Sequence, residues 1–504
     1  MGIPSYFNFI LRNHKRMLIQ SKHLVCDNLF IDANSLIYDC IHELTNVTSY
    51  EQVYKMVYEK ILELIKTNKP THKTYVCFDG VPPFPKMVQQ RQRRFKSSLT
   101  KEILRKKECS WDTNHITPGT CFMTGLDEYL HTQFQKQKNI VFSGSGEKNE
   151  GEHKICDLIR SQSHLYSNKN LIIYGLDADL IMLGLLLHSE GFHIFLYKET
   201  KHFDYMPHVS SEKNYYFDLQ VMAKEIDVLL QNKNIKQSTC DYIFMCFLCG
   251  NDFMPHIPAI HIRNDGISKL IGAYKAVRKT FIDVETNTIQ WSSFHKFIHF
   301  LQSNETEYIT QNITWKLKTK NHVKAFNEED KLNFLPCMDT KKEKYVLENM
   351  DEYNSYILDD PNIEEVCLNY LKVLEWTWYY YNGVKKNSDI CYKYPYGPRF
   401  CDLVRFIPIL NSHTFLPDKP SEDINVYTLL YFVLPYVNHE VIIPNDIHEN
   451  TKKELYYHMP EIKQMNFEFD YFLCKYFWES HLCMGNFDIK KLNRIVKHLN
   501  NIPM

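Results

Sequence analysis

The chain has little net charge, no long apolar run and no repeated or low-complexity tract. Its 504 residues carry 59 Lys and Arg against 60 Asp and Glu, which gives a net charge of −1. A protein that coats nucleic acid along its whole surface needs a basic domain, so any nucleic-acid contact must be local. The longest apolar stretches, such as residues 426–437, are shorter than the ~20 residues that span a bilayer. We therefore expect no membrane partner.

The amino terminus and the cysteines point to a compartment. Residues 1–16, MGIPSYFNFILRNHKR, do not show the charged and then long apolar pattern of a secretory signal. Tyr6 stands where a myristoylation signal needs Ser or Thr. The 15 cysteines are scattered along the chain, which is typical of reduced thiols. We expect a monomeric cytoplasmic protein, with the nucleus as the alternative.

The alternation of apolar runs predicts an α/β fold. Short apolar runs predict strands at 27–33, 73–80, 139–144, 170–178 and 192–198. Between them, residues 51–66 and 86–107 show helical patterns. Strands that alternate with helices indicate a mostly parallel central sheet with helices on its faces. Such sheets bind ligands at the carboxyl ends of their strands.

The pattern changes beyond the first 281 residues. Residues 282–343 are polar and charged, and we expect a linker or extended connection there. Residues 344–504 are rich in Trp, Tyr and Pro and are helical around 363–383. They predict a second, smaller and mainly helical region packed against the first.

Seven carboxylates at the ends of apolar segments give the strongest functional signal. They are Asp32, Asp79, Glu150, Glu152, Asp177, Asp179 and Asp252. An unpaired buried charge is costly, so converging carboxylates are tolerated where divalent cations neutralise them. Asp32, Asp79 and Asp177 each fall at the carboxyl end of a predicted strand, so they should share one rim of the sheet.

The spacing of the acids suggests two metal ions. Glu150 and Glu152 are two residues apart, as are Asp177 and Asp179, so both carboxylates of an extended pair would face the same side. Two pairs and three single acids suit two Mg²⁺ ions with shared ligands, and Mn²⁺ could substitute. Two such ions roughly 3.5–4 Å apart suit phosphodiester cleavage. A helix cap or turn explains any one acid, but the set predicts a metal-dependent nuclease.

A basic segment follows the second acid of the set. Residues 86–107 contain nine Lys or Arg and one acid, a local charge of +8. The members that recur at helical spacing are Lys86, Gln90, Arg93 and Arg94. Such a row of donors on one helical face can bind phosphate, and a solvated charged face is the alternative. Tyr38 could add a ring on which a base stacks for about 1–3 kcal/mol.

A second motif imitates a zinc site. Cys246 and Cys249 precede His256 and His261, but only six residues separate the two pairs, against about 12 in a zinc finger. The cysteines also lie in an apolar helical run. We interpret these residues as part of the core.

Several of these stretches resemble the 5′-to-3′ exoribonucleases, a family with cytoplasmic and nuclear eukaryotic members. The matching stretches are MGIPSYF, FIDANSLIYDC, FDGVPPFPKMVQQRQRRF, ITPGT, NEGEHKI, YGLDADLIMLGL and FLCGNDFMPHIP, with looser matches in LEWTWYYYNG, YPYGPRFCDL and YTLLYFVLPYVNHEVIIP. The resemblance implies a minimal catalytic core without long carboxyl-terminal extensions, built on the sheet of PIN and flap nucleases.

The resemblance also assigns roles to residues. The seven acids would hold Mg²⁺, and the row from Lys86 to Arg94 would form the pocket for a 5′-monophosphate. Tyr38 stands in place of a stacking His, and Tyr392 is the candidate for a stacking Trp without clear counterpart. Asn149 stands where a Gly is usual.

The activity implied is processive 5′-to-3′ hydrolysis of single-stranded RNA with a 5′-monophosphate, which releases nucleoside 5′-monophosphates in mRNA decay or RNA processing. Decapping factors are candidate partners. One alternative is a flap-endonuclease-like DNA nuclease, but Asp252 is followed by FMPHIPAIHIRNDGISKLI, without a paired Gly-x-Gly turn. Another is a non-catalytic binder of RNA 5′ ends, which would not need an intact set of acids.

Overall fold

Two compact units make up the chain, each from segments far apart in sequence. The computed structural model describes residues 3, 5–20, 24–44, 47, 49–104, 111–175, 177–199, 214–358, 362–384, 389–417, 422–485 and 487–502. Unit 1 comprises Met1–His14, Ala223–Ser421 and Phe467–Asn486, and unit 2 comprises Lys15–Met222, Glu422–Asn466 and Phe487–Met504. The predicted second region, 344–504, is therefore divided between the units.

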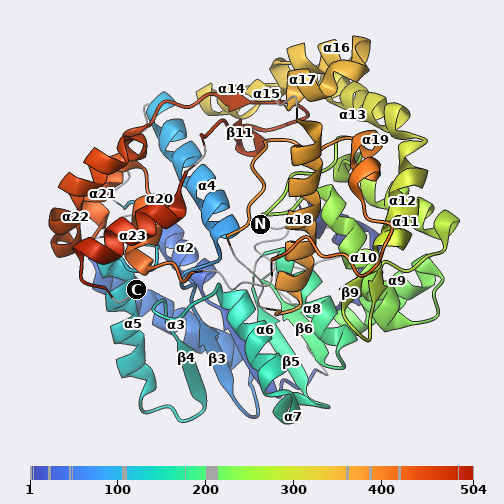
Figure 1. Ribbon diagram of the computed structural model, residues 1–504. Helices are drawn as coiled ribbons and strands as arrows, with labels where there is room; N and C mark the ends of the chain where they lie inside the picture. The colour runs from blue at the N-terminus through green and yellow to red at the C-terminus, as the bar shows by residue number, and fades with distance from the viewer. Residues whose placement is uncertain are drawn as a thin grey trace. The chain divides into compact units, whose positions relative to one another are not determined.

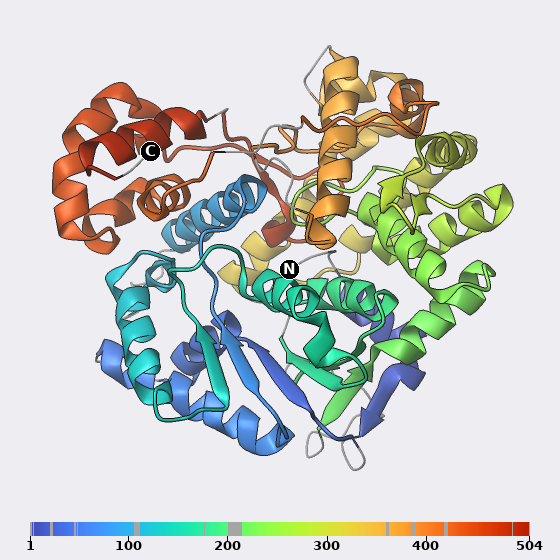
Figure 2. The same cartoon turned by 60° about the horizontal axis from the view of Figure 1, so that its bottom comes forward.

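Unit 2 is built on a seven-stranded sheet in the order β1-β7-β6-β5-β2-β3-β4. Five strands run parallel, as predicted, and lie side by side in Figures 1 and 2: β2 (Asn28–Asp32), β3 (Thr74–Cys77), β4 (Ile140–Ser143), β5 (Asn170–Tyr174) and β6 (His193–Tyr197). Two antiparallel strands that the sequence did not reveal complete one edge, β1 (Leu18–Gln20) and β7 (Tyr215–Asp218). They are too short for a clear pattern.

Helices accompany this sheet, most of them with one buried face, whereas the last of them is buried on all sides from Asp179 to Leu187. They are α2 (Asn34–Glu43), α3 (Tyr50–Asn68), α4 (Phe84–Ile103), α5 (Cys121–Phe134), α6 (Gly151–Ser161), α7 (Ser163–Tyr166) and α8 (Asp179–Ser189). In α3, Val53, Val57, Ile61 and Leu64 recur at helical spacing and are buried, because one face packs into the core. The predicted helices at 51–66 and 86–107 are thus α3 and α4, although residues 105–107 lie outside the described ones.

The carboxyl-terminal helices of unit 2 pack on one another, and one of them packs on α4. They are α20 (Val426–Val433), α21 (His439–Ile442), α22 (Asn445–His458) and α23 (Ile489–Leu499), and α20 contacts α4 directly. Arg91 of α4 is buried, donates to the carbonyl oxygen of Phe432, and lies 5.1 Å from the ring centres of both Phe432 and Phe487. One basic residue of the segment at 86–107 therefore has a packing role.

Unit 1 is mainly helical. Its longer helices are α1 (Tyr6–Asn13), α10 (Ile235–Cys246), α11 (Gly266–Val277), α12 (Trp291–Gln302), α13 (Glu305–Lys320), α16 (Lys341–Glu348) and α18 (Ile363–Tyr381). Its shorter helices are α14 (Glu328–Asn333), α15 (Leu335–Met338), α17 (Tyr353–Ile357) and α19 (Phe400–Leu403). It also has the strand pairs β8 (Ile282–Asp283) with β9 (Thr288–Ile289), and β10 (Phe469–Asp470) with β11 (His481–Leu482), while α9 (Leu219–Leu230) crosses the boundary between the units.

The prediction of a linker at 282–343 is wrong. This segment forms β8, β9, α12 to α15 and the start of α16. Helix α12 buries Trp291, Phe294, Phe297 and Leu301 along one face. The many charged residues conceal this apolar stripe, because they occupy the solvent side of helices whose other side is core.

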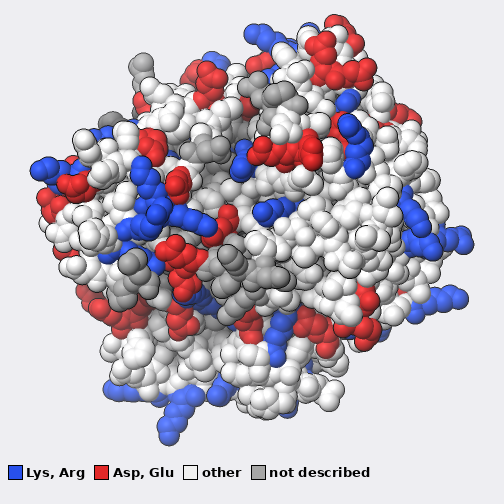
Figure 3. All heavy atoms as spheres, in the orientation of Figure 1, with Lys and Arg blue, Asp and Glu red and all other residues white. Residues whose placement is uncertain are grey.

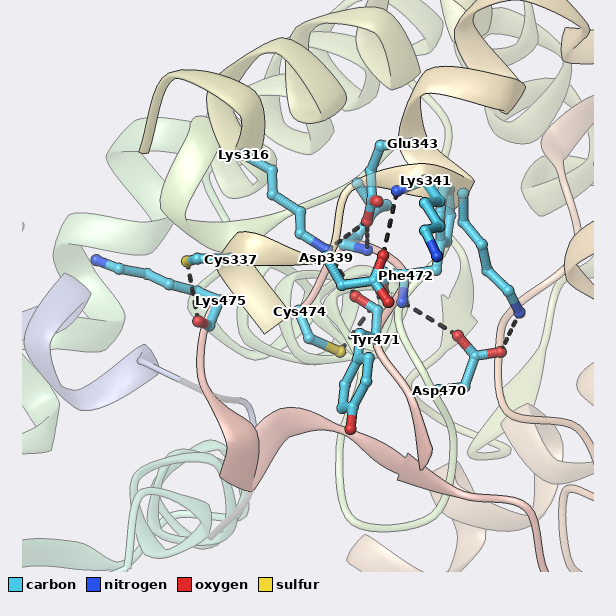
Figure 4. A network of polar contacts seen from close by, with 12 residues as sticks. Lys316, Cys337, Asp339, Lys341, Glu343, Asp470, Tyr471, Phe472, Cys474 and Lys475 are labelled. Atoms are coloured by element: carbon cyan, nitrogen blue, oxygen red, sulfur yellow. Dashed lines mark hydrogen bonds and ion pairs between the residues drawn. The ribbon is translucent and has the colours of Figure 1, made fainter. Parts of the chain in front are cut away.

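A buried ion pair joins distant segments of unit 1. Lys316 of α13 lies 2.5 Å from Glu343 of α16, and both side chains are 1% exposed (Figure 4). Lys316 also donates to the carbonyl oxygen of Tyr471 at 2.7 Å, and Glu343 accepts a hydrogen bond from the backbone N–H of Leu473 at 2.7 Å. Each charge thus has two partners, as a buried pair requires.

Removing one member of this pair should destabilise the fold. In Lys316→Met, the carboxylate of Glu343 would stay buried without its counter-ion, at a cost of about 3–5 kcal/mol in the free energy of unfolding. Lys331→Met is the control, because Lys331 and Glu328 form an exposed pair and should lose less than about 1 kcal/mol. Urea unfolding of both variants measures the difference, and equal losses would contradict the assignment.

His439 should make unit 2 sensitive to acid. The side chain is buried, with Nε2 3.1 Å from the carbonyl oxygen of Leu434 and Nδ1 3.0 Å from the hydroxyl of Tyr456. Burial lowers the pKa of His439 to about 3. Once the pH falls below the ordinary histidine pKa of about 6.5, His439 therefore binds a proton in the unfolded chain but stays unprotonated in the folded chain.

The free energy of unfolding should consequently fall as the pH drops below about 6.5, by up to about 1.4 kcal/mol per pH unit from this residue. Urea unfolding at about pH 7 and about pH 5 would measure the slope in the wild type and in His439→Gln. The variant should lose less stability on acidification. An unchanged slope would show that other groups control the acid response.

Candidate metal centre

Three of the predicted acids stand at one rim of the sheet in unit 2. Asp32 is the last residue of β2, Asp79 comes two residues after Cys77 at the end of β3, and Asp177 comes three residues after Tyr174 at the end of β5. Strand β2 pairs in parallel with both β3 and β5. The three acids therefore share the carboxyl rim, as predicted.

The paired acids stand at helix N-termini. Glu150 and Glu152 flank the first residue of α6, while Asp179 begins α8 with Asp177 two residues before it. The spacing argument assumed an extended chain, and the structure corrects this. A helix N-terminus carries partial positive charge from unpaired N–H groups, which favours carboxylates. Glu150, Glu152 and Asp179 are each at least nine-tenths buried.

Asp32 shows how strongly these acids interact. Burial is the main reason why the pKa of Asp32 lies well above its ordinary value. The charges of Asp79, Asp177 and Glu150 raise this pKa further, and the ammonium of Lys86 lowers it. A bound cation would relieve the same repulsion that raises the pKa.

Glu152 extends the cluster to the remaining acid of unit 2. Burial again raises its pKa most, and Lys86 opposes that rise. The charges of Glu150, Asp179 and Asp32 raise the pKa further. Six of the seven predicted acids are thus linked in one electrostatic cluster, which we call the acid cluster: Asp32, Asp79, Glu150, Glu152, Asp177 and Asp179.

The residues predicted to bind phosphate, from Lys86 to Arg94, have different surroundings in the structure. Lys86 Nζ lies 2.7 Å from Glu150 Oε1, so this ammonium belongs to the edge of the acid cluster. Arg93 is exposed, while Gln90 and Arg94 are buried. On the face of the molecule shown in Figure 3, basic and acidic side chains are interspersed, which agrees with local rather than general attraction of polyanions.

Arg94 has protein partners of its own. It donates to Asn114 Oδ1 at 3.0 Å and to the carbonyl oxygen of Ile116 at 3.3 Å. Burial lowers the pKa of Arg94 to about 10, and the charges of Tyr38 and Asp112 oppose this shift. Half-buried Tyr38 on α2 therefore lies close enough to Arg94 of α4 to affect its pKa, and stacking of a base on Tyr38 remains a prediction.

His153 is a functional candidate that the sequence analysis missed. Its ligand atom and those of Glu150 and Glu152 all lie within 4.8 Å of one another, and all three residues are buried. Burial lowers the pKa of His153 well below its ordinary value, with the charges of Lys86 and Arg160 adding to the effect. A neutral imidazole can coordinate a metal. The available signal was its position directly after Glu152.

The backbone explains the substitution at Asn149. Its φ is 76°, in the left-handed region that favours glycine. Asn is among the residues that tolerate this conformation best, because its short polar side chain can bond locally. The turn that delivers Glu150 is thus kept without glycine.

Asp252 belongs to unit 1, where it is half-buried in the segment after Cys249. Its grouping with the acid cluster remains a prediction. Cys246 and Cys249 are buried thiols, and among the described residues the only cluster of metal-ligand type is the one around Glu150, so the core interpretation holds.

Tyr392 also lies in unit 1, and it is not presented to a ligand. The side chain is 8% exposed, the hydroxyl donates to the carbonyl oxygen of Tyr396 at 2.8 Å, and the ring packs against Tyr370 and Tyr394. The prediction that Tyr392 could replace the missing Trp is wrong, because this ring completes the core.

The donor set fits divalent cations. Carboxylate oxygens at strand ends and helix N-termini are the ligands that Mg²⁺ and Mn²⁺ prefer, and an imidazole adds a nitrogen ligand. Asp32, Glu150, Glu152 and Asp179 are buried, so their charges have little solvent to stabilise them. A cation would supply that stabilisation.

Gly151 keeps room for this arrangement. A Cβ atom added there would lie 2.6 Å from Asp32 Oδ1 and 2.9 Å from the carbonyl oxygen of Cys77. Gly151→Ala should displace the Asp32 carboxylate and weaken Mn²⁺ binding by about tenfold or more. Calorimetric titration with Mn²⁺ measures the change.

Gly272→Ala is the matched control, because a Cβ there meets nothing within 4 Å and the residue is also helical. It should leave Mn²⁺ affinity unchanged. Its expected effect is on the stability of the helix alone, because Ala is more favourable there than Gly by roughly 0.5–1 kcal/mol. Unaltered Mn²⁺ binding in Gly151→Ala would contradict a need for close approach at this site.

Two family models match parts of this chain. The model for the XRN 5′-3′ exonuclease N-terminus matches residues 1–198, and the model for the Xrn1 helical domain matches residues 232–335. A solved structure of the catalytic core of Rad2 in complex with DNA substrate has a TM-score of 0.32 and 12% identity, covering 70% of this chain and 85% of that one. That likeness is too small to carry an argument.

Curated relatives match over much of the chain. 5′-3′ exoribonuclease 1 of Saccharomyces cerevisiae is 33% identical over 55% of this chain and 20% of its own length. The Homo sapiens protein of that name is 28% identical over 84% of this chain and 30% of its own length. 5′-3′ exoribonuclease 2 of Kluyveromyces lactis is 27% identical over 73% of this chain and 45% of its own length. The chain spans less than half the length of these relatives. It belongs to the XRN family of 5′-3′ exonucleases.

Proposed function

We propose that this chain is a processive 5′-to-3′ exoribonuclease. It would degrade single-stranded RNA that carries a 5′-monophosphate and release nucleoside 5′-monophosphates. The observation that carries the proposal is the buried acid cluster at the rim of the sheet, in a chain that matches the XRN models.

The acids and the imidazole define the metal chemistry of the proposal. Asp32, Glu150, Glu152 and Asp179 would hold Mg²⁺ or Mn²⁺ together with their exposed and half-buried partners, and Asp252 would complete the set. Two such ions supply charge that stabilises the attacking and the leaving oxygen of an in-line displacement. His153 would add a neutral nitrogen ligand beside Glu150 and Glu152.

The basic helix would recognise the RNA end. Lys86 lies 2.7 Å from Glu150, so a phosphate bound by its ammonium would sit directly beside the acid cluster. Exposed Arg93 would make a second phosphate contact, and buried Gln90 and Arg94 would shape the pocket. Tyr38 would offer a ring to the first base. The pocket would fix register at the first nucleotide, and its size would exclude a cap or a triphosphate.

The setting of the enzyme is part of the same proposal. We place it in the cytoplasm as a monomer that takes part in mRNA decay, with decapping factors as suppliers of 5′-monophosphate ends. The 14 cysteines of the described part of the chain are free thiols, which suits a reducing compartment. Among the described residues, no helix is both long enough and apolar enough to cross a membrane.

The proposal predicts strict dependence on the 5′ end and on the metal. One single-stranded RNA, labelled at its 3′ end, would be supplied with a 5′-monophosphate or a 5′-hydroxyl and followed with Mg²⁺, with EDTA and with Asp179→Ala. Mononucleotides should be released from the phosphorylated RNA alone. EDTA and Asp179→Ala should abolish the release, because both remove metal from the cluster.

Other outcomes would replace the proposal. Equal release from both RNAs would show that the basic helix does not select phosphate. Internal cuts regardless of the 5′ end would indicate an endonuclease of the flap type. RNA binding without cleavage in the presence of Mg²⁺ would leave a binder of 5′ ends.

A further inference from the structure

Asp79 is held by two hydrogen-bond donors, one on each carboxylate oxygen. Oδ2 accepts from Asn34 Nδ2 at 2.6 Å, and Oδ1 accepts from the backbone N–H of Gly151 at 2.7 Å. The backbone N–H of Asp79 in turn donates to Asn34 Oδ1 at 3.2 Å. Both the amide nitrogen and the amide oxygen of Asn34 therefore hydrogen-bond to Asp79.

The two donors come from segments that carry the other acids. Asn34 begins α2, two residues after Asp32, and Gly151 lies between Glu150 and Glu152. The carboxylate of Asp79 is thus tied on one side to the strand end of Asp32 and on the other to the start of α6. Its orientation is set by both neighbours at once.

We propose that Asn34 is a positioning residue, which fixes the carboxylate of Asp79 relative to Asp32 and thereby sets the affinity of the acid cluster for divalent cations. The inference rests on the proposed metal-dependent function. Groups that hydrogen-bond to metal ligands orient them, and their loss costs 10–100-fold in metal affinity or activity in general.

The chemistry of an amide suits this task. Asn34 supplies a donor to the carboxylate and an acceptor to the N–H of Asp79 without adding charge. A cationic side chain would lower the negative charge that attracts the metal, and an anionic one would repel Asp79. An apolar side chain of similar size could fill the same space but would make no hydrogen bond to Asp79.

The backbone beside Asp79 is secured without Asn34. Gly80 N–H donates to the carbonyl oxygen of Asn149 at 2.8 Å, and Asn149 N–H donates to that of Val81 at 3.1 Å. Lys154 Nζ donates to the carbonyl oxygens of Phe78 and Gly144, both at 2.7 Å. Loss of Asn34 should therefore release the Asp79 side chain while the turn that carries it stays in place.

The experiment measures metal binding in the absence of RNA. Mn²⁺ would be titrated into the full chain by calorimetry and by electron paramagnetic resonance, for wild type, Asn34→Leu and Asn34→Ala. We expect Mn²⁺ affinity to fall by about 10-fold or more in both variants. In the Mg²⁺-dependent assay, kcat should fall by a similar factor while KM for RNA stays within about twofold.

Asn68→Leu is the matched control. Asn68 is a buried asparagine of unit 2 whose amide also makes two hydrogen bonds, to the carbonyl oxygen of Leu64 and from the hydroxyl of Tyr216, both 2.9 Å. It should lower thermal stability and leave Mn²⁺ affinity unchanged. A structural role alone would make the Asn34 variants behave in the same way.

The outcomes separate the inference from the proposed function. Wild-type Mn²⁺ affinity in Asn34→Leu and Asn34→Ala, with or without a loss of stability, would overturn the positioning role and leave the nuclease proposal standing. Absence of Mn²⁺ binding by the wild type would overturn the metal-dependent function itself, and the inference with it.

Discussion

Repulsion among buried carboxylates is the constraint on which unit 2 depends. Burial raises the pKa of Asp32, Asp79 and Glu152, and neighbouring acids raise the pKa of Asp32 and Glu152 further. A fold that concentrates like charges in this way loses stability unless their charge is offset. The cluster is therefore a costly feature of the unit, and several surrounding groups offset part of its charge.

The support comes from backbone as much as from side chains. Parallel strands place Asp32 and Asp79 at one rim, and acids stand at the N-termini of α6 and α8, where the N–H of Gly151 donates to Asp79. Gly151 lets two acid-bearing segments approach closely because it has no Cβ. The ammonium of Lys86 offsets part of the remaining charge.

Unit 1 contains a buried ion pair in which the two charges balance. Lys316 and Glu343 neutralise each other directly, and a backbone group satisfies each of them further. That pair is complete within the protein. Among the described residues, the six carboxylates of the acid cluster are opposed by the ammonium groups of Lys86 and Lys154, an imbalance that favours binding of cations from outside. The contrast between a balanced and an unbalanced set of charges is what distinguishes a structural ion pair from a candidate metal centre.

Local sequence was sufficient for much of the architecture. The strands β2 to β6 and the helices α3 and α4 follow from apolar periodicity, because strand and helix patterns are short-range properties of the chain. The acids at strand ends follow too, since a charged residue that closes an apolar run marks the rim of a sheet. Asp32, Asp79 and Asp177 needed no tertiary information.

Other features were decided only by tertiary structure. The short strands β1 and β7 form because they pair with each other and with β6 at the edge of the sheet. Helix α12 is stabilised because its aromatic face is buried in the core. The ion pair of Lys86 with Glu150, the lowered pKa of His153 and the burial of Tyr392 all depend on contacts between residues distant in sequence. The sequence by itself determined which groups are available and roughly where the strands end. The tertiary structure decided their partners, because hydrogen bonds, burial and electrostatic coupling depend on distances that local pattern does not contain.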